Sequence, residues 1–196
     1  MCKKSKKQII FTTVLVSLLV FFDQFTKQLA VTYLKDKNPI SIVKDIFELK
    51  YLENTSAAFG MDPISLLHGI FSFDIFNNDP YFFLQVRIGF FVVLTLAMVA
   101  LFAIIYLRIP SEKRFVYLDY VLTFFTAGAI GNFIDRLTQQ YVVDFLYFKL
   151  IDFPIFNVAD IYVTCAAAAL LVLGIFYYKD EDIDRIFPSK DIENQE

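Results

Sequence analysis

The chain has 196 residues, of which 57% are hydrophobic, and its mean hydropathy is +0.55. An ordinary soluble domain carries roughly 45–50% apolar residues, so this composition excludes a disordered chain and argues against a soluble enzyme. The formal net charge of −3 offers no basic face for nucleic acid. Two cysteines cannot build a disulfide framework, and neither lies in a metal-binding pattern.

Four uncharged, mostly apolar runs divide the chain. They contain 15 residues at 8–22, 20 residues at 88–107, 15 residues at 120–134 and 18 residues at 161–178. A membrane-spanning helix needs about 20 residues, so the first and third runs are long enough only if nearby charged residues belong to the helix. We therefore predict one α-helical membrane domain over 1–196, with spans at about 8–34, 83–107, 115–137 and 157–178.

The first run also has features of a secretory signal peptide, because several lysines precede an apolar stretch. No small-residue cleavage site follows it, since the chain continues with Asp23-Gln24-Phe25-Thr26-Lys27. We therefore interpret this run as a retained first span. Charged residues at membrane depth are costly and point to function by default. Asp119, at the start of the third span, is instead interpreted as marking the boundary between membrane and water.

Lysine and arginine residues predict the orientation of the chain. Four lysines precede the first span, three basic residues lie between the second and third spans, and Lys179 and Arg185 follow the fourth. The positive-inside rule then places both termini in the cytoplasm. Outside the membrane we expect a small β element at about 40–60, followed by an interfacial segment over 59–81. The charged tail over 179–196 is expected to be cytoplasmic and unpacked.

The polar residues that interrupt the apolar sequence meet on one side of the membrane in an up-down-up-down arrangement. They are Asp23, Lys27, Asn132, Asp135, Arg136, Asp144, Asn157 and Asp160. Asn132 and Asp135 are three residues apart, and so are Asn157 and Asp160. Residues at this spacing share a helix face, so each of these aspartates has an amide beside it that can hold the carboxylate in place.

Two aspartates in one site share a proton, because both cannot be ionised comfortably. The ionised member can take a proton from water while the protonated member polarises a carbonyl, and together these steps hydrolyse a peptide bond. Asp144 has an apolar setting and Asp160 begins a helix, so we favour this pair. A pair that uses Asp135 stays open, although the adjacent Arg136 favours a structural role for it.

Proton or ion transport is the rival function, because carboxylates inside a membrane also serve as proton relays. A relay would place these groups nearer the midplane of the membrane. Here they gather on one side, and the second and fourth spans have apolar centres. The pattern therefore favours hydrolysis over transport.

Five sequence blocks resemble the lipoprotein signal peptidase family, also called signal peptidase II. They are Asp23-Gln24-Phe25-Thr26-Lys27, Asn54-Thr55-Ser56-Ala57-Ala58-Phe59, Gly128-Ala129-Ile130-Gly131-Asn132-Phe133-Ile134-Asp135-Arg136, Val142-Val143-Asp144-Phe145 and Phe156-Asn157-Val158-Ala159-Asp160. Their order and spacing fit the family from about residue 9 to residue 178. Ser56 stands where the family usually has glycine, so a positive φ at that turn would be strained here.

The resemblance implies a four-helix membrane aspartyl protease with a small extracytoplasmic β cradle and no metal or organic cofactor. It implies removal of the signal peptide from diacylglyceryl-modified bacterial prolipoproteins, with cleavage before the lipid-modified cysteine by activated water. The catalytic pair falls on Asp144 and Asp160. The supporting residues fall on Asn54, Asn132, Arg136, Asn157, Asp135, Asp23 and Lys27.

The resemblance also suggests roles for the supporting residues. Asn54 would bind the substrate backbone from the β cradle, whereas Asn132 and Asn157 would orient the dyad. Arg136 would order the site or face the lipid-modified residue. We expect a monomer in the bacterial inner membrane, in contact with membrane lipid, with its active site near the outer face.

Overall fold

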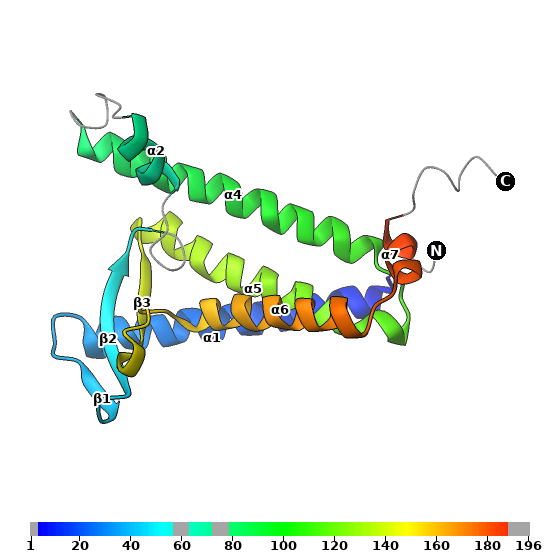
Figure 1. Cartoon of the computed structure of the whole chain (residues 1–196), viewed down its shortest axis with the longest axis horizontal. Helices are drawn as coiled ribbons and strands as arrows, with labels where there is room; N and C mark the ends of the chain where they lie inside the picture. Colours follow the sequence, from blue (N-terminus) through cyan, green and yellow to red (C-terminus); the bar gives the residue numbers. More distant parts are fainter. Residues whose placement is uncertain (1–3, 57–62, 72–78, 188–196) are drawn as a thin grey trace.

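The computed structural model describes residues 4–56, 63–71 and 79–187. Four long helices form most of this part of the chain, and they run side by side (Figure 1). Their bounds are Lys6–Leu34 for α1, Pro80–Arg108 for α4, Val116–Gln139 for α5 and Val158–Phe176 for α6. Each coincides with one of the four predicted spans. The mostly helical fold is therefore confirmed.

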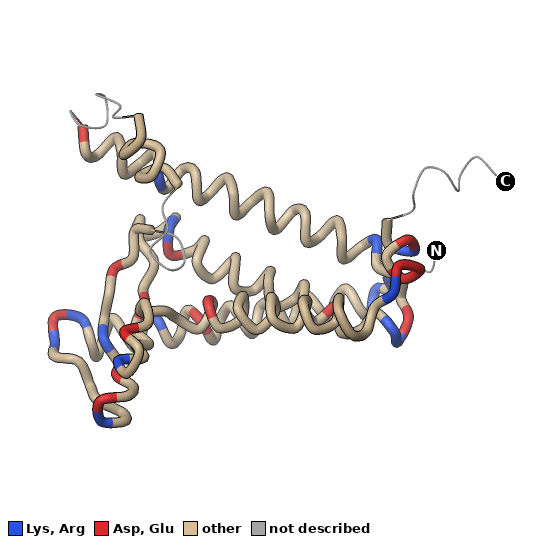
Figure 2. The backbone as a smooth tube through the Cα atoms, viewed as in Figure 1, with Lys and Arg blue, Asp and Glu red and all other residues tan. Residues whose placement is uncertain are grey.

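Three of these helices, α1, α4 and α6, are long and apolar enough to cross a membrane. Helix α5 has 24 residues, and its buried residues include the polar side chains of Thr123 and Asp135. The tube in Figure 2 shows that charged residues gather at the two ends of the helix group. Length and composition alone thus support three crossings, and α5 is a fourth long helix that buries polar side chains, as α1 does with Asp23 and Lys27.

A small antiparallel sheet lies at one end of the helices (Figure 1). Its strands are β1 (Ile40–Val43), β2 (Phe47–Asn54) and β3 (Val142–Phe148), in the order β1-β2-β3. The first two lie within the predicted β element, but the third strand was not predicted. Its register places the start of β3 beside the end of β2, so that Leu52 pairs with Asp144. The sheet therefore brings Asp144 next to the end of β2.

Strand β3 anchors the sheet to the first helix. Val143 and Phe145 of β3 are buried in a cluster with Ala30 and Leu34 of α1. Burying these side chains removes apolar surface from water, which stabilises the packed arrangement. The 3-10 turn Lys149–Ile151 follows β3 and leads toward the start of α6.

Two glycines of α5 permit close contact with neighbouring helices. A Cβ atom added at Gly128 would lie 2.6 Å from the carbonyl oxygen of Ala159 in α6. A Cβ atom added at Gly131 would lie 2.5 Å from Oδ2 of Asp23 in α1. Both distances are shorter than a Cβ atom and an oxygen atom tolerate. The absence of side chains at Gly128 and Gly131 therefore allows α5 to pack closely against α6 and α1.

Part of the predicted interfacial segment forms helix α2, Pro63–Phe71, next to α4 (Figure 1). Leu66, Ile70 and Phe71 of this helix are strongly exposed. An exposed apolar face agrees with an interfacial position. Residues 59–62 and 72–78 of the predicted segment lie outside the described residues.

The segment after α6 is folded over Asp180–Ile186, which corrects the prediction of an unpacked tail there. These residues form α7, whose Ile186 is buried with Ile109 and other apolar side chains. Arg114, in the region of the 3-10 turn Lys113–Phe115, donates to both carboxylate oxygens of Asp182 at 2.6 and 2.5 Å. These bonds lower the pKa of Asp182 to about 2. The fold therefore includes α7 at the end opposite the sheet.

Asp119, which the sequence predicts to mark the boundary of the third span, is ion-paired at one end of the helix group. Its Oδ2 lies 2.5 Å from Nζ of Lys4, whose side chain is only 1% exposed. The pair joins the start of α1 to the start of α5. Asp119 thus stabilises one end of the helix group and lies far along α5 from the polar residues near the sheet.

Candidate active site

A cavity of about 710 Å³ lies among α4, α5, α6 and the residues around β3. Most of its lining is apolar, including Phe91 and Met98 of α4 and Ile161 of α6. The amide, carboxyl and guanidinium side chains in the lining are Asn54, Asn132, Arg136, Asp144 and Asp160. Asp144 and Asp160 therefore reach the same apolar cavity from two different elements.

Asp144 is held by an amide on each carboxylate oxygen. Nδ2 of Asn54 donates to Oδ2 at 2.8 Å, and Nδ2 of Asn157 donates to Oδ1 at 2.7 Å. The residue is only 1% exposed. Burial, together with the negative charge of Asp160, raises the pKa of Asp144 to about 7, although the two amide donors oppose the shift. Asp144 therefore keeps a proton close to neutral pH.

Asp160 is fixed by the local structure at the start of α6. Asn157 caps this helix, because its Oδ1 accepts from the backbone N–H of Asp160 at 3.0 Å. In return the backbone N–H of Asn157 donates to Oδ2 of Asp160 at 3.1 Å. This reciprocal arrangement is a capping box. Asn157 thus caps the helix with its oxygen and holds Asp144 with its nitrogen.

Asn132 connects the carboxylate of Asp160 to Lys27, a buried residue of α1. Its Oδ1 accepts from Nζ of Lys27 at 2.9 Å and from Nδ2 of Asn157 at 3.2 Å. With its oxygen occupied by two donors, Asn132 turns its Nδ2 toward Oδ1 of Asp160, to which it donates at 2.9 Å. Lys27 and Asn157 therefore together set the direction of the amide that contacts Asp160.

The buried layer consists of Asp23, Lys27 and Asp135. Nζ of Lys27 lies 2.9 Å from Oδ2 of Asp23 and 3.0 Å from Oδ2 of Asp135. Oδ1 of Asp23 accepts from the backbone N–H of Ala159 at 2.8 Å, which ties α1 to the start of α6. Since all three charged groups are buried and paired, the layer holds α1, α5 and α6 in register.

Asp135 lies in this layer and is not among the residues that line the cavity. Its Oδ2 also accepts from the backbone N–H of Val143 at 3.1 Å, and its Oδ1 accepts from Nε2 of Gln24 at 2.9 Å. Gln24 had no predicted role, although it belongs to the sequence block that begins with Asp23. With its oxygens bound in this way, Asp135 has the surroundings of a structural residue.

The turn after β2, Asn54–Ser56, is next to Asp144. Oδ1 of Asn54 accepts from the backbone N–H of Ser56 at 2.8 Å, and Nη2 of Arg136 donates to the Ser56 carbonyl at 3.0 Å. The amide of Asn54 therefore contacts Asp144 and its own turn. The guanidinium of Arg136 also lies 4.9 Å from the centre of the Phe91 ring.

Ser56 does not adopt the strained backbone that its place in a glycine position suggested. Among the described residues other than glycine, a positive φ occurs at Asp36, Asp45, Gln140 and Asp152. Serine therefore fits the turn without conformational cost.

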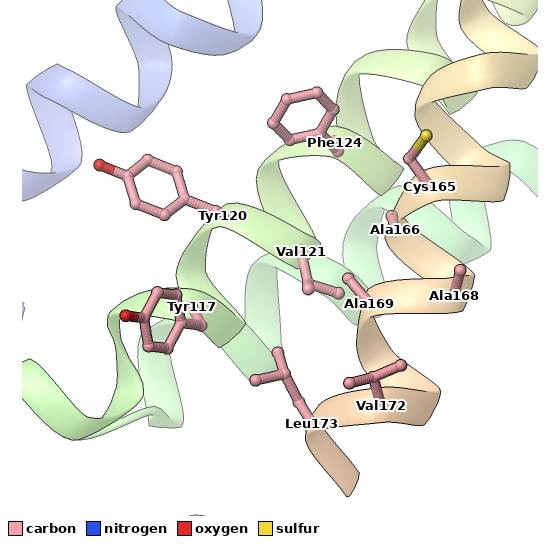
Figure 3. Close-up of a pocket in the computed structure, with 10 residues that line it drawn as sticks. All are labelled: Tyr117, Tyr120, Val121, Phe124, Cys165, Ala166, Ala168, Ala169, Val172 and Leu173. Atoms are coloured by element: carbon pink, nitrogen blue, oxygen red, sulfur yellow. The ribbon is translucent and has the colours of Figure 1, made fainter. Parts of the chain in front are cut away.

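A second cavity, of about 500 Å³, lies between α5 and α6 (Figure 3). Tyr117, Phe124 and Leu173 are among the side chains that surround it. The residues labelled in Figure 3 include no carboxyl or amide side chain. The largely apolar cavity that Asp144 and Asp160 line is therefore the candidate active site.

A model of the family described as signal peptidase (SPase) II matches residues 15–176. The chain belongs to the signal peptidase II family. A lipoprotein signal peptidase from Caldanaerobacter subterraneus is 37% identical over 164 residues, which cover 83% of this chain and 94% of that protein. One from Brevibacillus brevis is 35% identical over 158 residues, which cover 81% of this chain and 90% of that protein. The chain is thus an enzyme of a family of membrane aspartic proteases.

Two solved structures, both described as bacterial membrane enzymes, have a similar fold. One is 25% identical, with a TM-score of 0.65, and the match covers 91% of this chain and 99% of that one. The other is 24% identical, also with a TM-score of 0.65, and the match covers 100% of this chain and 96% of that one. The fold of this signal peptidase II family member is therefore similar to that of solved membrane enzymes.

Proposed function

We propose that this chain removes the signal peptide from diacylglyceryl-modified bacterial prolipoproteins, with Asp144 and Asp160 as its catalytic pair. Cleavage falls just before the lipid-modified cysteine. The observation that carries the proposal is the convergence of these two aspartates on one largely apolar cavity. Membership of the signal peptidase II family and the names of the relatives support the substrate class.

The chemistry follows from a pair of carboxyl groups that share one proton. The ionised aspartate takes a proton from water, and the water oxygen forms a bond to the scissile carbonyl carbon. The protonated aspartate gives its proton to the carbonyl oxygen. When the tetrahedral intermediate collapses, the C–N bond breaks and the leaving amine receives a proton from the first aspartate. The second regains its proton from the intermediate, so the pair returns to its starting state.

The residues around the pair have distinct supporting roles in this proposal. Asn54 and Asn157 hold Asp144, and Asn132 holds Asp160, so that the carboxyl groups keep their positions while charge moves between them. Such fixed donors need no reorganisation during the reaction. The buried layer of Asp23, Lys27 and Asp135 supports this arrangement from below, and Gln24 contributes to the same layer.

Arg136 and the apolar lining fit a lipid-modified substrate. The cavity is lined by phenylalanines and aliphatic side chains from α4, α5 and α6, which suit an acyl chain or an apolar signal segment. The guanidinium of Arg136 reaches the polar end of the same cavity, where it can bind the ester or amide carbonyls of a substrate. Together they favour a substrate that is part lipid and part peptide.

We place the enzyme in the inner membrane as a single-domain monomer that crosses the membrane four times and contacts membrane lipid. The positive-inside rule puts both termini in the cytoplasm and the sheet at the outer face. The short, charged ends and apolar middle of the helix group support this placement. The active site would then lie near the outer face, where lipoprotein precursors emerge.

The test uses the full chain reconstituted in liposomes, with a diacylglyceryl-modified prolipoprotein and the same precursor without lipid. We expect cleavage of the lipidated precursor, with the modified cysteine as the new first residue by mass spectrometry. Equal cleavage of both precursors would contradict the proposed specificity. Proton flux across the liposomes that disappears in Asp144→Asn, without any peptide cleavage, would favour transport instead.

A further inference from the structure

Two arginines from different helices hold the turn that carries Asn54. Arg136 of α5 binds the carbonyl of Ser56, as described above. Arg87 of α4 binds the same turn, and its Nη2 donates to the carbonyl oxygen of Thr55 at 3.2 Å. The same nitrogen lies 3.3 Å from the hydroxyl of Ser56 and 3.4 Å from the hydroxyl of Thr55. Arg87 therefore contacts both residues that follow Asn54.

The position of this turn affects Asp144, because Asn54 at the start of the turn binds the carboxylate. Nδ2 of Asn54 donates to Asp144, while its Oδ1 accepts from the backbone N–H of Ser56. A movement of Ser56 would pull on the side chain of Asn54 and change its contact with Asp144. The position of the turn and the position of the amide on Asp144 are thus mechanically connected.

We propose that Arg87 is a positioning residue, which holds the Asn54–Ser56 turn against α4 so that Asn54 stays bound to Asp144. This inference rests on the proposed function of Asp144. Arg87 is half-buried one turn before Phe91, and it is not among the described residues that line the cavity. It therefore acts on the aspartate through the turn and not through the substrate.

Ser56 is part of this contact, which gives its departure from the family's usual glycine a physical meaning. A glycine at this position would have no side-chain oxygen for Arg87. The backbone at Ser56 does not require a positive φ, so the serine occupies the turn without strain. The hydroxyl of Ser56 thus supplies an additional acceptor for the guanidinium at the place where α4 meets the turn.

The first test replaces Arg87 in the full-length protein and measures cleavage of lipidated prolipoprotein. For Arg87→Gln we expect kcat to fall about tenfold, as for loss of a charged hydrogen bond, while KM changes less than about twofold because the substrate is not contacted. Arg108→Gln, at the opposite and exposed end of α4, is the matched control and should leave both constants unchanged. A rise in KM at constant kcat would overturn the proposal.

The second test separates positioning from a general loss of structure. If Arg87 acts through Asn54, then Arg87→Gln should cause little further loss of kcat in an Asn54→Ala background, because the connection is already broken. Equal losses in both backgrounds would overturn the proposal. Arg87→Lys keeps one cationic donor and should restore part of kcat, and Ser56→Ala should lower it by about twofold, less than Arg87→Gln.

These outcomes can be distinguished from failure of the proposed function. If the unmodified protein does not cleave the lipidated precursor, or if Asp144→Asn retains full activity, the function itself is wrong. If those two results are as expected and Arg87→Gln has unchanged kcat, the function stands and the positioning role is wrong.

Discussion

Asp144 is the residue whose surroundings are most unusual for its type. A carboxyl group that is only 1% exposed is normally paired, and Asp144 accepts from two neutral amides and lies near a second aspartate in the same cavity. Its raised pKa follows from burial and from the charge of Asp160. The shared proton of the proposed pair is a consequence of these surroundings.

The pH dependence of activity should reflect this proton. Because the pKa of Asp144 is raised to about 7, the pair keeps its proton below that pH and loses it above. Without the proton, no acid polarises the scissile carbonyl, so kcat should fall as the pH rises from about 7 to 9. The measurement is kcat for lipidated precursor across this range in detergent micelles.

A variant of Asn54 gives the control for that pH profile. The amide of Asn54 lowers the pKa of Asp144 by binding its ionised form, so Asn54→Ala should move the decline in kcat to higher pH. An activity that stays level from pH 6 to pH 9 in the unmodified protein would contradict the assignment of the proton to this pair.

At the residue scale, the sequence predicts which polar side chains belong to the candidate site, but it does not predict which of them contact one another. The residues lining the polar end of the cavity, such as Asp144 and Asp160, could be selected because they interrupt apolar sequence. The contact of Asn54 with Asp144 could not, because it depends on strand pairing between distant segments. Arg87 had no predicted role because its partner Thr55, in the turn after β2, lies 32 residues earlier in the sequence.

At the scale of elements, α5 and α6 approach each other closely at a glycine. Gly128 faces the Ala159 carbonyl and the side chain of Val163, where an added Cβ would lie 2.6 and 2.7 Å away. A backbone atom cannot give way as the end of a flexible side chain can. The start of α6, which carries Asp160, therefore depends on the absence of a side chain at Gly128.

Gly128→Ala should consequently destabilise the folded protein. Overpacking at a tight contact costs about 1–3 kcal/mol, and we expect a lower Tm in thermal denaturation, together with reduced cleavage activity because α6 must shift. Gly89→Ala on α4 is the matched control, since an added Cβ there meets nothing within 4 Å. A Tm for Gly128→Ala equal to that of the control would show that the contact is not tight.

Strand β3 and helix α7 are two elements that the sequence patterns did not predict. The segment Val142–Phe148 contains several β-branched and aromatic residues, yet its place in the sheet depends on partners far away in β2. Helix α7 is short and charged, and it is ordered by tertiary contacts such as Arg114 with Asp182. By contrast, the four long helices followed from the lengths of the apolar runs.

At the scale of the whole molecule, charge is separated from apolar surface along the helix axes. The sheet occupies one end, and the start of α1 and helix α7 occupy the other (Figure 1). A membrane can cover the apolar middle while both charged ends reach water. The orientation of this arrangement across the membrane is a prediction from the positive-inside rule.

Labelling of single cysteines tests that orientation. In a background with Cys2→Ser and Cys165→Ser, we expect Asp45→Cys, at an exposed turn between β1 and β2, to react with a membrane-impermeant maleimide added to intact spheroplasts. Ser111→Cys, between α4 and α5, should react only after the membrane is opened. The reverse pattern would place the sheet in the cytoplasm and contradict the proposed access of the site to exported precursors.

The central claim is that Asp144 and Asp160 together perform peptide hydrolysis, and single substitutions to asparagine test it most directly. Cleavage of a diacylglyceryl-modified prolipoprotein should fall by about 10²–10⁴-fold in Asp144→Asn and equally in Asp160→Asn, the range expected for loss of acid–base catalysis. Both variants should still fold, because asparagine has nearly the same shape. Full activity in either variant would contradict the account. The account would also be contradicted if Asp135→Asn, still folded, were the only one of the three variants to lose cleavage.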